Sequence, residues 1–136
     1  MLEFCRGGLT LLNSILQLYL ANAVVEKTTI DGWKVIKYAD GSCKGYKDVV
    51  ASGKITALAT SGTLAAFGYL GITPEASPSG ITLEAFTGEL LKTDGWGFLV
   101  RMAGTGIRSD FRFLSFGGGG ETRNLTIRWK FTGTWK

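Results

Sequence analysis

Gly32-Trp33-Lys34-Val35-Ile36-Lys37-Tyr38-Ala39-Asp40-Gly41 is the stretch of the chain that most directly indicates its fold. Apolar and polar side chains alternate along it, as they do in a β-strand that buries one face. The run ends at Asp40-Gly41, a pair that readily adopts the positive φ angles of a tight hairpin turn. The pattern therefore predicts a hairpin whose returning strand runs from Cys43 to Val49.

A second stretch centred on tryptophan closes the chain: Ile127-Arg128-Trp129-Lys130-Phe131-Thr132-Gly133-Thr134-Trp135-Lys136. Trp33 in the first stretch, and Trp129 and Trp135 in the second, alternate with polar neighbours along their expected strands. Aromatic side chains bury a large apolar area wherever they pack. We therefore expect these three tryptophans to lie in the core or at an interface between subunits.

Short strand-like runs fill the region between the two stretches, each bounded by turn-forming residues. The clearest loop runs from Pro74 to Gly80, and it is too short to separate two domains. With the first hairpin, these runs predict about eight strands and a mainly β fold, an antiparallel β-sandwich of the jelly-roll kind. The predicted strands cover residues 55–60, 63–70, 81–87, 97–103, 111–116 and 125–131.

The composition is that of one small folded domain. The chain has 136 residues, of which 45% are hydrophobic and 19% charged, enough for one core. Its 20 glycines and 2 prolines indicate many tight turns between short elements. We expect an N-terminal helix over residues 1–24 and a β-sandwich domain over residues 25–136.

The expected N-terminal helix has a broad apolar face. Apolar side chains recur at a spacing of three and four residues, which places them along one stripe of a helix. Such a helix packs on its own domain, pairs with copies of itself or enters a membrane. The stripe comprises Leu9, Leu12, Leu16, Tyr19 and Ala23, widened by Leu11, Ile15 and Leu18.

A cleaved signal peptide is the main rival interpretation of this segment. Arg6 precedes the apolar run, and Ala21-Asn22-Ala23 has the small-x-small form of a cleavage site. Polar residues such as Asn13 and Gln17 interrupt the run, and a membrane span needs about 18 apolar residues in succession. Both features disfavour secretion and membrane insertion, which leaves self-association and packing against the domain as the main interpretations.

The residue types limit the chemistry. The chain has no histidine, which excludes histidine-based triads and histidine acid–base catalysis. A pair of carboxylates of the glycosidase kind is the remaining catalytic option, but most of the candidates lie beside glycines in turns, where aspartate forms hydrogen bonds with its own backbone. We expect no enzymatic activity. The candidates are Asp31, Asp40, Asp48, Glu84, Glu89, Asp94 and Asp110.

The positions of the two cysteines indicate neither a metal site nor a disulfide bond. Cys5 and Cys43 are far apart in sequence, and no histidine is present to complete a zinc site. A disulfide between them would need the N-terminal segment to fold back on the first hairpin. We expect two reduced thiols, no metal and no cofactor.

The net charge of +4 is concentrated near the C-terminus. A cationic face attracts polyanions, including teichoic acids, acidic polysaccharides and nucleic acid. Basic residues that alternate with apolar ones, as in Arg128-Trp129-Lys130, more often form the solvated face of a strand. The phenylalanines at 111, 113 and 116 are better explained as a buried strand face than as a platform for bases, so no nucleic-acid partner is expected.

The residues favour saccharide binding as the site chemistry, because a sugar ring stacks on an aromatic side chain while its hydroxyls form hydrogen bonds with nearby carboxylates. Trp96 and Asp94 are the leading candidates, since Thr93-Asp94-Gly95-Trp96-Gly97 is a turn-like setting between strands. Tyr69 and Glu75 are weaker candidates. The alternative is that Trp96 covers one end of the core.

The first hairpin and the C-terminus together resemble a known family. Gly-Trp-Lys-x-x-Lys-Tyr-x-Asp-Gly after Val24-Val25-Glu26-Lys27, with a chain end of Gly-x-Trp-Lys, resembles the receptor-binding head of tailed-phage tail fibres and baseplate proteins. The resemblance covers roughly residues 24–50 and 125–136. It implies a homotrimer at a fibre tip in a phage or prophage virion, made in the bacterial cytoplasm, whose heads touch a polysaccharide of the host cell surface. In that family a helical stem gathers the three chains before the heads begin, so the resemblance favours self-association of residues 1–24 as a trimerisation stem.

Two other functions remain open at this point. A secreted bacterial carbohydrate-binding module would require cleavage after Ala23 and a monomeric β domain. A small glycan-degrading enzyme would require two carboxylates facing each other across a groove. The favoured expectation is a non-enzymatic structural and adhesion protein.

Overall fold

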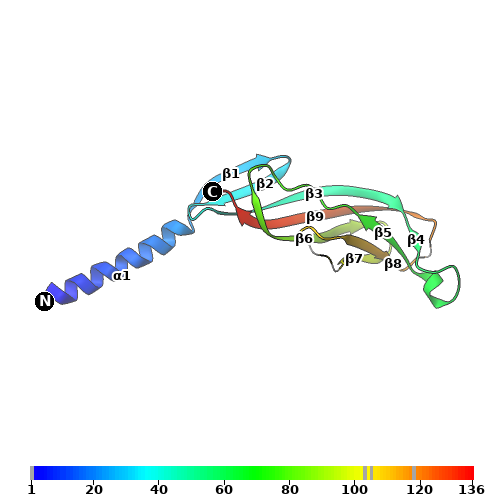
Figure 1. Cartoon of the computed structure of the whole chain (residues 1–136), viewed down its shortest axis with the longest axis horizontal. Coiled ribbons are helices and arrows are strands. Elements are labelled where there is room, and N and C mark those ends of the chain that lie inside the picture. The colour runs from blue at the N-terminus through cyan, green and yellow to red at the C-terminus, as the bar shows by residue number, and fades with distance from the viewer. Residues whose placement is uncertain (1, 103, 105, 118) are drawn as a thin grey trace.

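The computed structural model of the chain describes residues 2–102, 104, 106–117 and 119–136, and within its helix it describes the side chains of residues 10–20. These residues form an α-helix, a 3-10 turn and nine strands in two antiparallel sheets (Figure 1). The expected class, a mainly β antiparallel sandwich with an N-terminal helix, is confirmed.

Sheet A contains five strands and sheet B four. The order in sheet A is β1 (Val24–Ile30), β2 (Trp33–Tyr38), β3 (Ser42–Lys54), β9 (Thr122–Thr134) and β6 (Thr82–Thr93). The order in sheet B is β4 (Thr56–Ala57), β5 (Gly68–Ile72), β8 (Phe111–Ser115) and β7 (Gly97–Arg101).

The core lies between the two sheets and is rich in aromatic rings. Phe86 stacks on Trp129 with 5.4 Å between ring centroids, and Phe111 from sheet B meets the same indole edge-on at 4.9 Å. Trp33 and Trp129 are 0% and 1% exposed, which confirms their predicted place in the core. Trp135 is half-buried and packs against the core, with its indole N–H donating to the carbonyl oxygen of Tyr38.

Two Asp-Gly pairs shape the edge of sheet A. Asp40-Gly41 closes the predicted hairpin: Gly41 has φ 93° and the Asp40 carboxylate accepts from the amide and hydroxyl of Ser42. Asp31-Gly32 makes a second, two-residue hairpin between β1 and β2, with φ 51° and 81° as a type I′ turn requires.

Strand β1 corrects the predicted end of the helix. The helix was predicted over residues 1–24, but α1 (Leu2–Ala21) ends earlier and Val24 begins a strand. The segment Val24–Ile30 is rich in β-branched residues and pairs with β2 along its length, so strand pairing outweighs the helical spacing.

The alanine-rich segment was predicted wrongly. Residues 63–70 were expected to be one strand, whereas Thr63–Ala66 form a 3-10 turn and β5 begins at Gly68. Of the strand expected over 55–60, only Thr56–Ala57 is present. Alanine has low strand propensity, and Gly62 at φ 79° sets the chain on a turn.

Strands β3, β6 and β9 are longer than predicted because their glycines lie inside them. A Cβ on Gly88 would come within 2.6 Å of the Trp129 ring, and a Cβ on Gly45 would come equally close to Phe131. These glycines make room for the large core rings, so they do not end their strands.

Helix α1 projects away from the sandwich (Figure 1). The side chains of residues 10–20 are all exposed, including Leu12 at 64% and Tyr19 at 74%. None of the buried core residues comes from the described part of α1. Where α1 joins the sandwich, the amide of Ala39 donates a hydrogen bond to the carbonyl oxygen of Ala23.

Candidate functional site

The outer face of sheet A carries two aligned rows of side chains that cross all five strands. The strand register places Thr29, Lys34, Tyr46, Lys130 and Thr87 side by side in one row. Each side chain points away from the core because its neighbours in sequence, such as Trp33 and Trp129, point into it.

A second row lies two residues along from the first. It consists of Lys27, Ile36, Lys44, Thr132 and Ala85, again one from each strand. The lysines of the two rows stand on alternate strands, Lys27 and Lys44 in one row and Lys34 and Lys130 in the other. The Cα atoms of the lysines in one row are therefore roughly 10 Å apart, since neighbouring strands are separated by about 4.8 Å.

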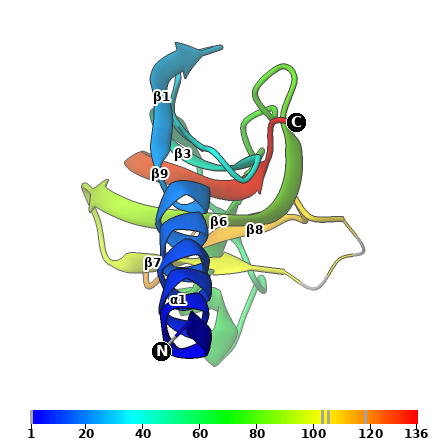
Figure 2. The same cartoon turned by 90° about the vertical axis from the view of Figure 1, so that its left-hand side faces the viewer.

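These rows line a hollow of about 800 Å³, hereafter the trough. Figure 2 shows the curl of the sheet, with β1 standing upright at one edge while β9 and β6 lie across the view. Of the described residues that line the trough, five are basic and none is acidic. The basic residues are Lys27, Lys34, Lys44, Arg128 and Lys130.

Tyr46 lies at the centre of the trough, and its ring is contacted by cationic side chains from both neighbouring strands. The Arg128 guanidinium of β9 lies 4.5 Å from its ring centroid, and the Lys34 ammonium of β2 lies 5.5 Å away. Contacts of this kind between a cation and a ring are attractive. They hold the ring and its hydroxyl in place on an otherwise open face.

Two of the five cations have carboxylate partners just beyond the trough. Arg128 donates from Nε and Nη2 to the two oxygens of Asp48 at 2.7 and 2.8 Å. These hydrogen bonds lower the pKa of Asp48 and raise that of Arg128. Lys130 pairs with Glu89 at 2.6 Å, and this hydrogen bond lowers the pKa of that carboxyl.

The other three cations have no such partner. Within the part of the chain that the structure describes, Lys27, Lys34 and Lys44 form no ion pair. All three side chains are exposed. Lys44 lies over the ring of Tyr38 at 5.9 Å, which leaves its charge available to a ligand. The trough can therefore accept anionic groups.

Trp96 and Asp94, the leading sequence candidates, lie together in the turn between β6 and β7. They line a small hollow of about 400 Å³, and Trp96 is 83% exposed. The expected alternative, that Trp96 covers the core, is therefore wrong. Asp94 accepts from the amide and the side-chain nitrogen of Asn124, and these bonds lower its pKa. Asp94 thus fixes the turn that presents the indole.

Tyr69 and Glu75 lie elsewhere, and neither lines the trough or the Trp96 hollow. Tyr69 stands on the outer face of sheet B, where the Arg112 guanidinium lies 4.9 Å from its ring centroid. Glu75 lies in the loop that precedes β6, and it pairs with Lys47 at 2.8 Å. The four candidates are therefore not parts of one site.

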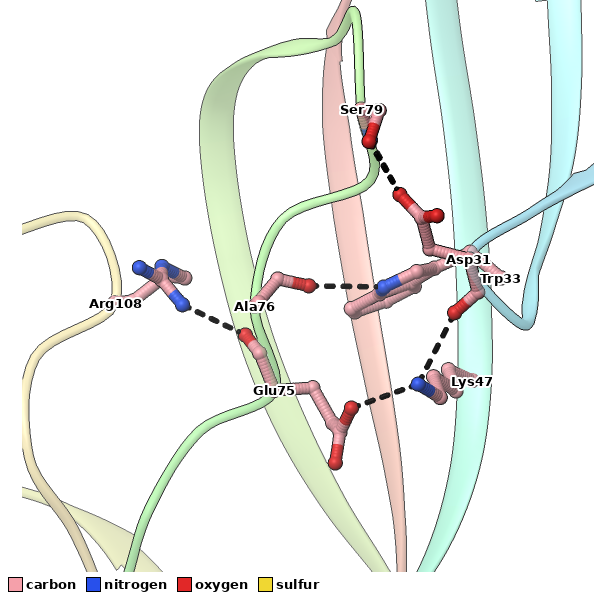
Figure 3. A network of polar contacts seen from close by, with 7 residues as sticks. All are labelled: Asp31, Trp33, Lys47, Glu75, Ala76, Ser79 and Arg108. Atoms are coloured by element: carbon pink, nitrogen blue, oxygen red, sulfur yellow. Dashed lines mark hydrogen bonds and ion pairs between the residues drawn. The ribbon is translucent and has the colours of Figure 1, made fainter.

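Glu75 belongs to a polar network that fastens its loop to sheet A (Figure 3). The Trp33 indole N–H donates to the Ala76 carbonyl oxygen at 3.0 Å, and Lys47 reaches both Glu75 and the Asp31 carbonyl oxygen. The network also includes Ser79, whose amide and hydroxyl donate to Asp31 and lower its pKa, and Arg108, which donates to the Glu75 carbonyl oxygen.

Cys43 is a free, buried thiol, and burial raises its pKa. The side chain of Cys5, its suggested disulfide partner, lies outside the described residues. Among the described side chains, no cluster of histidine, cysteine, aspartate or glutamate could hold a metal ion. No described helix has the length and apolar character to cross a membrane.

The chain matches no protein-family model, no curated protein and no solved structure.

The trough was not predicted from the sequence. Lys34, Lys44 and Lys130 were visible as basic residues that alternate with apolar ones, which is also the pattern of any solvated strand face. What distinguishes them is the register that aligns β1, β2, β3, β9 and β6. Pairings between strands as distant in sequence as β3 and β9 leave no local signal.

Proposed function

We propose that the protein is a non-enzymatic structural and adhesion protein of a phage or prophage tail. In this proposal α1 is a stem that gathers three chains, and each sandwich is a head that adheres to a saccharide of the bacterial surface. The resemblance of the first hairpin and the chain end to phage receptor-binding heads motivates the assignment.

The observation that carries the proposal is the exposed apolar face of α1. Leu12, Leu16 and Tyr19 lie along one stripe, and each is more than half exposed. Contiguous apolar surface of this kind marks an interaction site. Because the helix projects away from the sandwich, copies of it can pack together without displacing the heads (Figure 1).

The heads offer two surfaces that suit saccharide binding. The trough presents cations and hydroxyls around Tyr46, and the turn at Trp96 presents an exposed indole. Three heads on one stem gain avidity over a single head on a repetitive polymer, on the order of a hundredfold or more. Self-association and adhesion are therefore linked in the proposal.

Cosedimentation with purified bacterial cell walls, from a panel of species, tests both parts. The double variant Leu12→Glu with Leu16→Glu places two charges on the apolar stripe. The matched control, Ser14→Glu with Gln17→Glu, adds the same charge to the polar face of the same helix. All four positions are exposed, so neither variant disturbs the core.

The wild type and the control are expected to sediment with the walls of at least one species, whereas the stripe variant stays largely in solution. Equal sedimentation of all three proteins would show that adhesion does not depend on the stem. If the wild type sediments with no wall in the panel, the adhesion function is wrong.

A further inference from the structure

We infer that the trough on sheet A is a binding site for an acidic glycan, a saccharide polymer that bears phosphodiester or carboxylate groups. This inference rests on the proposed function only in assigning the ligand to the bacterial surface. It adds the location of the site, the charge of the ligand and the residues that recognise it.

The charge of the trough sets the sign of the ligand. Its lining includes five cations and no carboxylate among the described residues, and Lys27, Lys34 and Lys44 lack ion-pair partners there. Unpaired like charges on one face repel one another, so an anionic ligand relieves this repulsion as it binds. Acidic groups in the ligand would also receive charge-assisted hydrogen bonds from the ammonium groups.

The spacing of the cations fits an extended polymer better than a single small anion. Lys27 and Lys44 stand on alternate strands of one row, and Lys34 and Lys130 on alternate strands of the next. Cations whose Cα atoms are roughly 10 Å apart within a row, and which are spread over four strands, suit a ligand with several acidic groups better than one phosphate or carboxylate group. They can bond successive acidic groups along a chain that crosses the strands.

The remaining lining favours a sugar polymer over nucleic acid. Thr29 and Thr87 stand at the two ends of one row, and Thr132 stands beside Lys44 in the other. Their hydroxyl groups can exchange hydrogen bonds with sugar hydroxyls. Single-stranded nucleic acid requires aromatic faces on which bases stack. Tyr46 is the aromatic residue in the open rows of the trough, and cations from Arg128 and Lys34 already contact its ring.

Titration calorimetry of the full-length protein with short oligomers tests the inference. The acidic probes are an oligomer of glycerol phosphate and an oligogalacturonate, which separate phosphodiester from carboxylate recognition. A neutral dextran oligomer and a single-stranded deoxythymidine oligomer of similar length serve as comparison ligands. A short oligomer occupies one trough, so the measurement does not depend on whether the chains associate.

The trough variant is Lys34→Gln with Lys44→Gln, and its matched control is Lys54→Gln with Lys92→Gln. Each variant loses two positive charges, and all four lysines are exposed. The two variants differ in that Lys34 and Lys44 line the trough, whereas Lys54 and Lys92 lie outside it. We expect at least one acidic oligomer to bind, with a loss of about tenfold or more in the trough variant and about twofold or less in the control. Added salt should weaken the wild type more than the trough variant.

Four results would overturn the inference. The first three are no binding of either acidic oligomer, equal binding of the neutral dextran, and binding of the deoxythymidine oligomer as tight as that of the acidic glycans. The fourth is an equal loss of affinity in the two variants, which would attribute the effect to net charge and not to the trough. Binding by a protein that proves monomeric would support the trough while it contradicts the stem. An associating protein that binds no acidic oligomer would do the reverse.

Discussion

The Arg128 guanidinium lies 4.5 Å from the centroid of the Tyr46 ring, and its Nε and Nη2 atoms donate two hydrogen bonds to the Asp48 carboxylate. Tyr46 and Asp48 are two residues apart on β3, and Arg128 lies on the neighbouring strand β9. The three side chains thus form one fixed unit that extends from Tyr46 at the centre of the trough to Asp48 just beyond it. This unit links the stability of the head to the position of its candidate ligand-binding residues.

Acidification should expose the contribution of Asp48 to stability. Its hydrogen bonds from Arg128 lower its pKa in the folded state below the ordinary value of 3.8. The contribution is therefore fully present above pH 3.8 and is lost as the pH falls through the lower folded pKa. Thermal unfolding between pH 7 and pH 2 should show a smaller acid-induced loss in Asp48→Asn than in the wild type.

Other carboxylates with lowered pKa, such as Asp31 and Asp94, also stabilise the folded protein, and both proteins lose these contributions on acidification. Only the difference between the two pH profiles reports on Asp48. Parallel profiles would mean that the Arg128 pair contributes no net stability.

Trp33 should contribute to stability through its polar network as well as through packing. Trp33→Phe removes the 3.0 Å hydrogen bond to Ala76 and leaves a void in the core, so it should cost about 1–3 kcal/mol of unfolding free energy. Urea unfolding measures the change. Trp96→Phe is the matched control, because an indole that is 83% exposed should contribute little. Equal effects of the two substitutions would contradict the assigned roles.

Glycines within the strands should differ sharply in their tolerance of alanine. A Cβ at Gly88 would lie 2.6 Å from the Trp129 ring and 3.0 Å from Leu99, so Gly88→Ala should cost about 1–3 kcal/mol. A Cβ at Gly71 meets nothing within 4 Å, and Gly71→Ala should be neutral or stabilise by about 0.5 kcal/mol. Chemical denaturation of both variants checks this. A neutral Gly88→Ala would show that the core is less tightly packed than described.

Trp96 and Asp94 stay a predicted saccharide contact, separate from the trough. Trp96→Ala should reduce cosedimentation with cell walls, because it removes an exposed stacking surface. It should leave calorimetric binding of a short acidic oligomer unchanged, since Trp96 does not line the trough. Unchanged wall binding would remove Trp96 from the candidate residues, and weaker oligomer binding would show that the two surfaces act together.

The sequence allowed the core to be predicted better than the functional surfaces. The alternation around Trp33 and Trp129 was informative because burial of one strand face imposes a local period of two. The same rule could not identify Thr63–Ala66 as a 3-10 turn, since residues 64–67 are all apolar and show no period of two. Tyr46 was placed in a predicted strand, but its neighbours Lys34 and Arg128 belong to other strands. Only the long-range register brings them together.

The absolute mass of the full-length protein in solution tests the central claim of a self-associating stem most directly. Light scattering behind a sizing column should give three chains of 14.6 kDa for the wild type and for Ser14→Glu with Gln17→Glu. It should give a single chain for Leu12→Glu with Leu16→Glu. A wild type that elutes as one 14.6 kDa chain at every concentration would contradict the account.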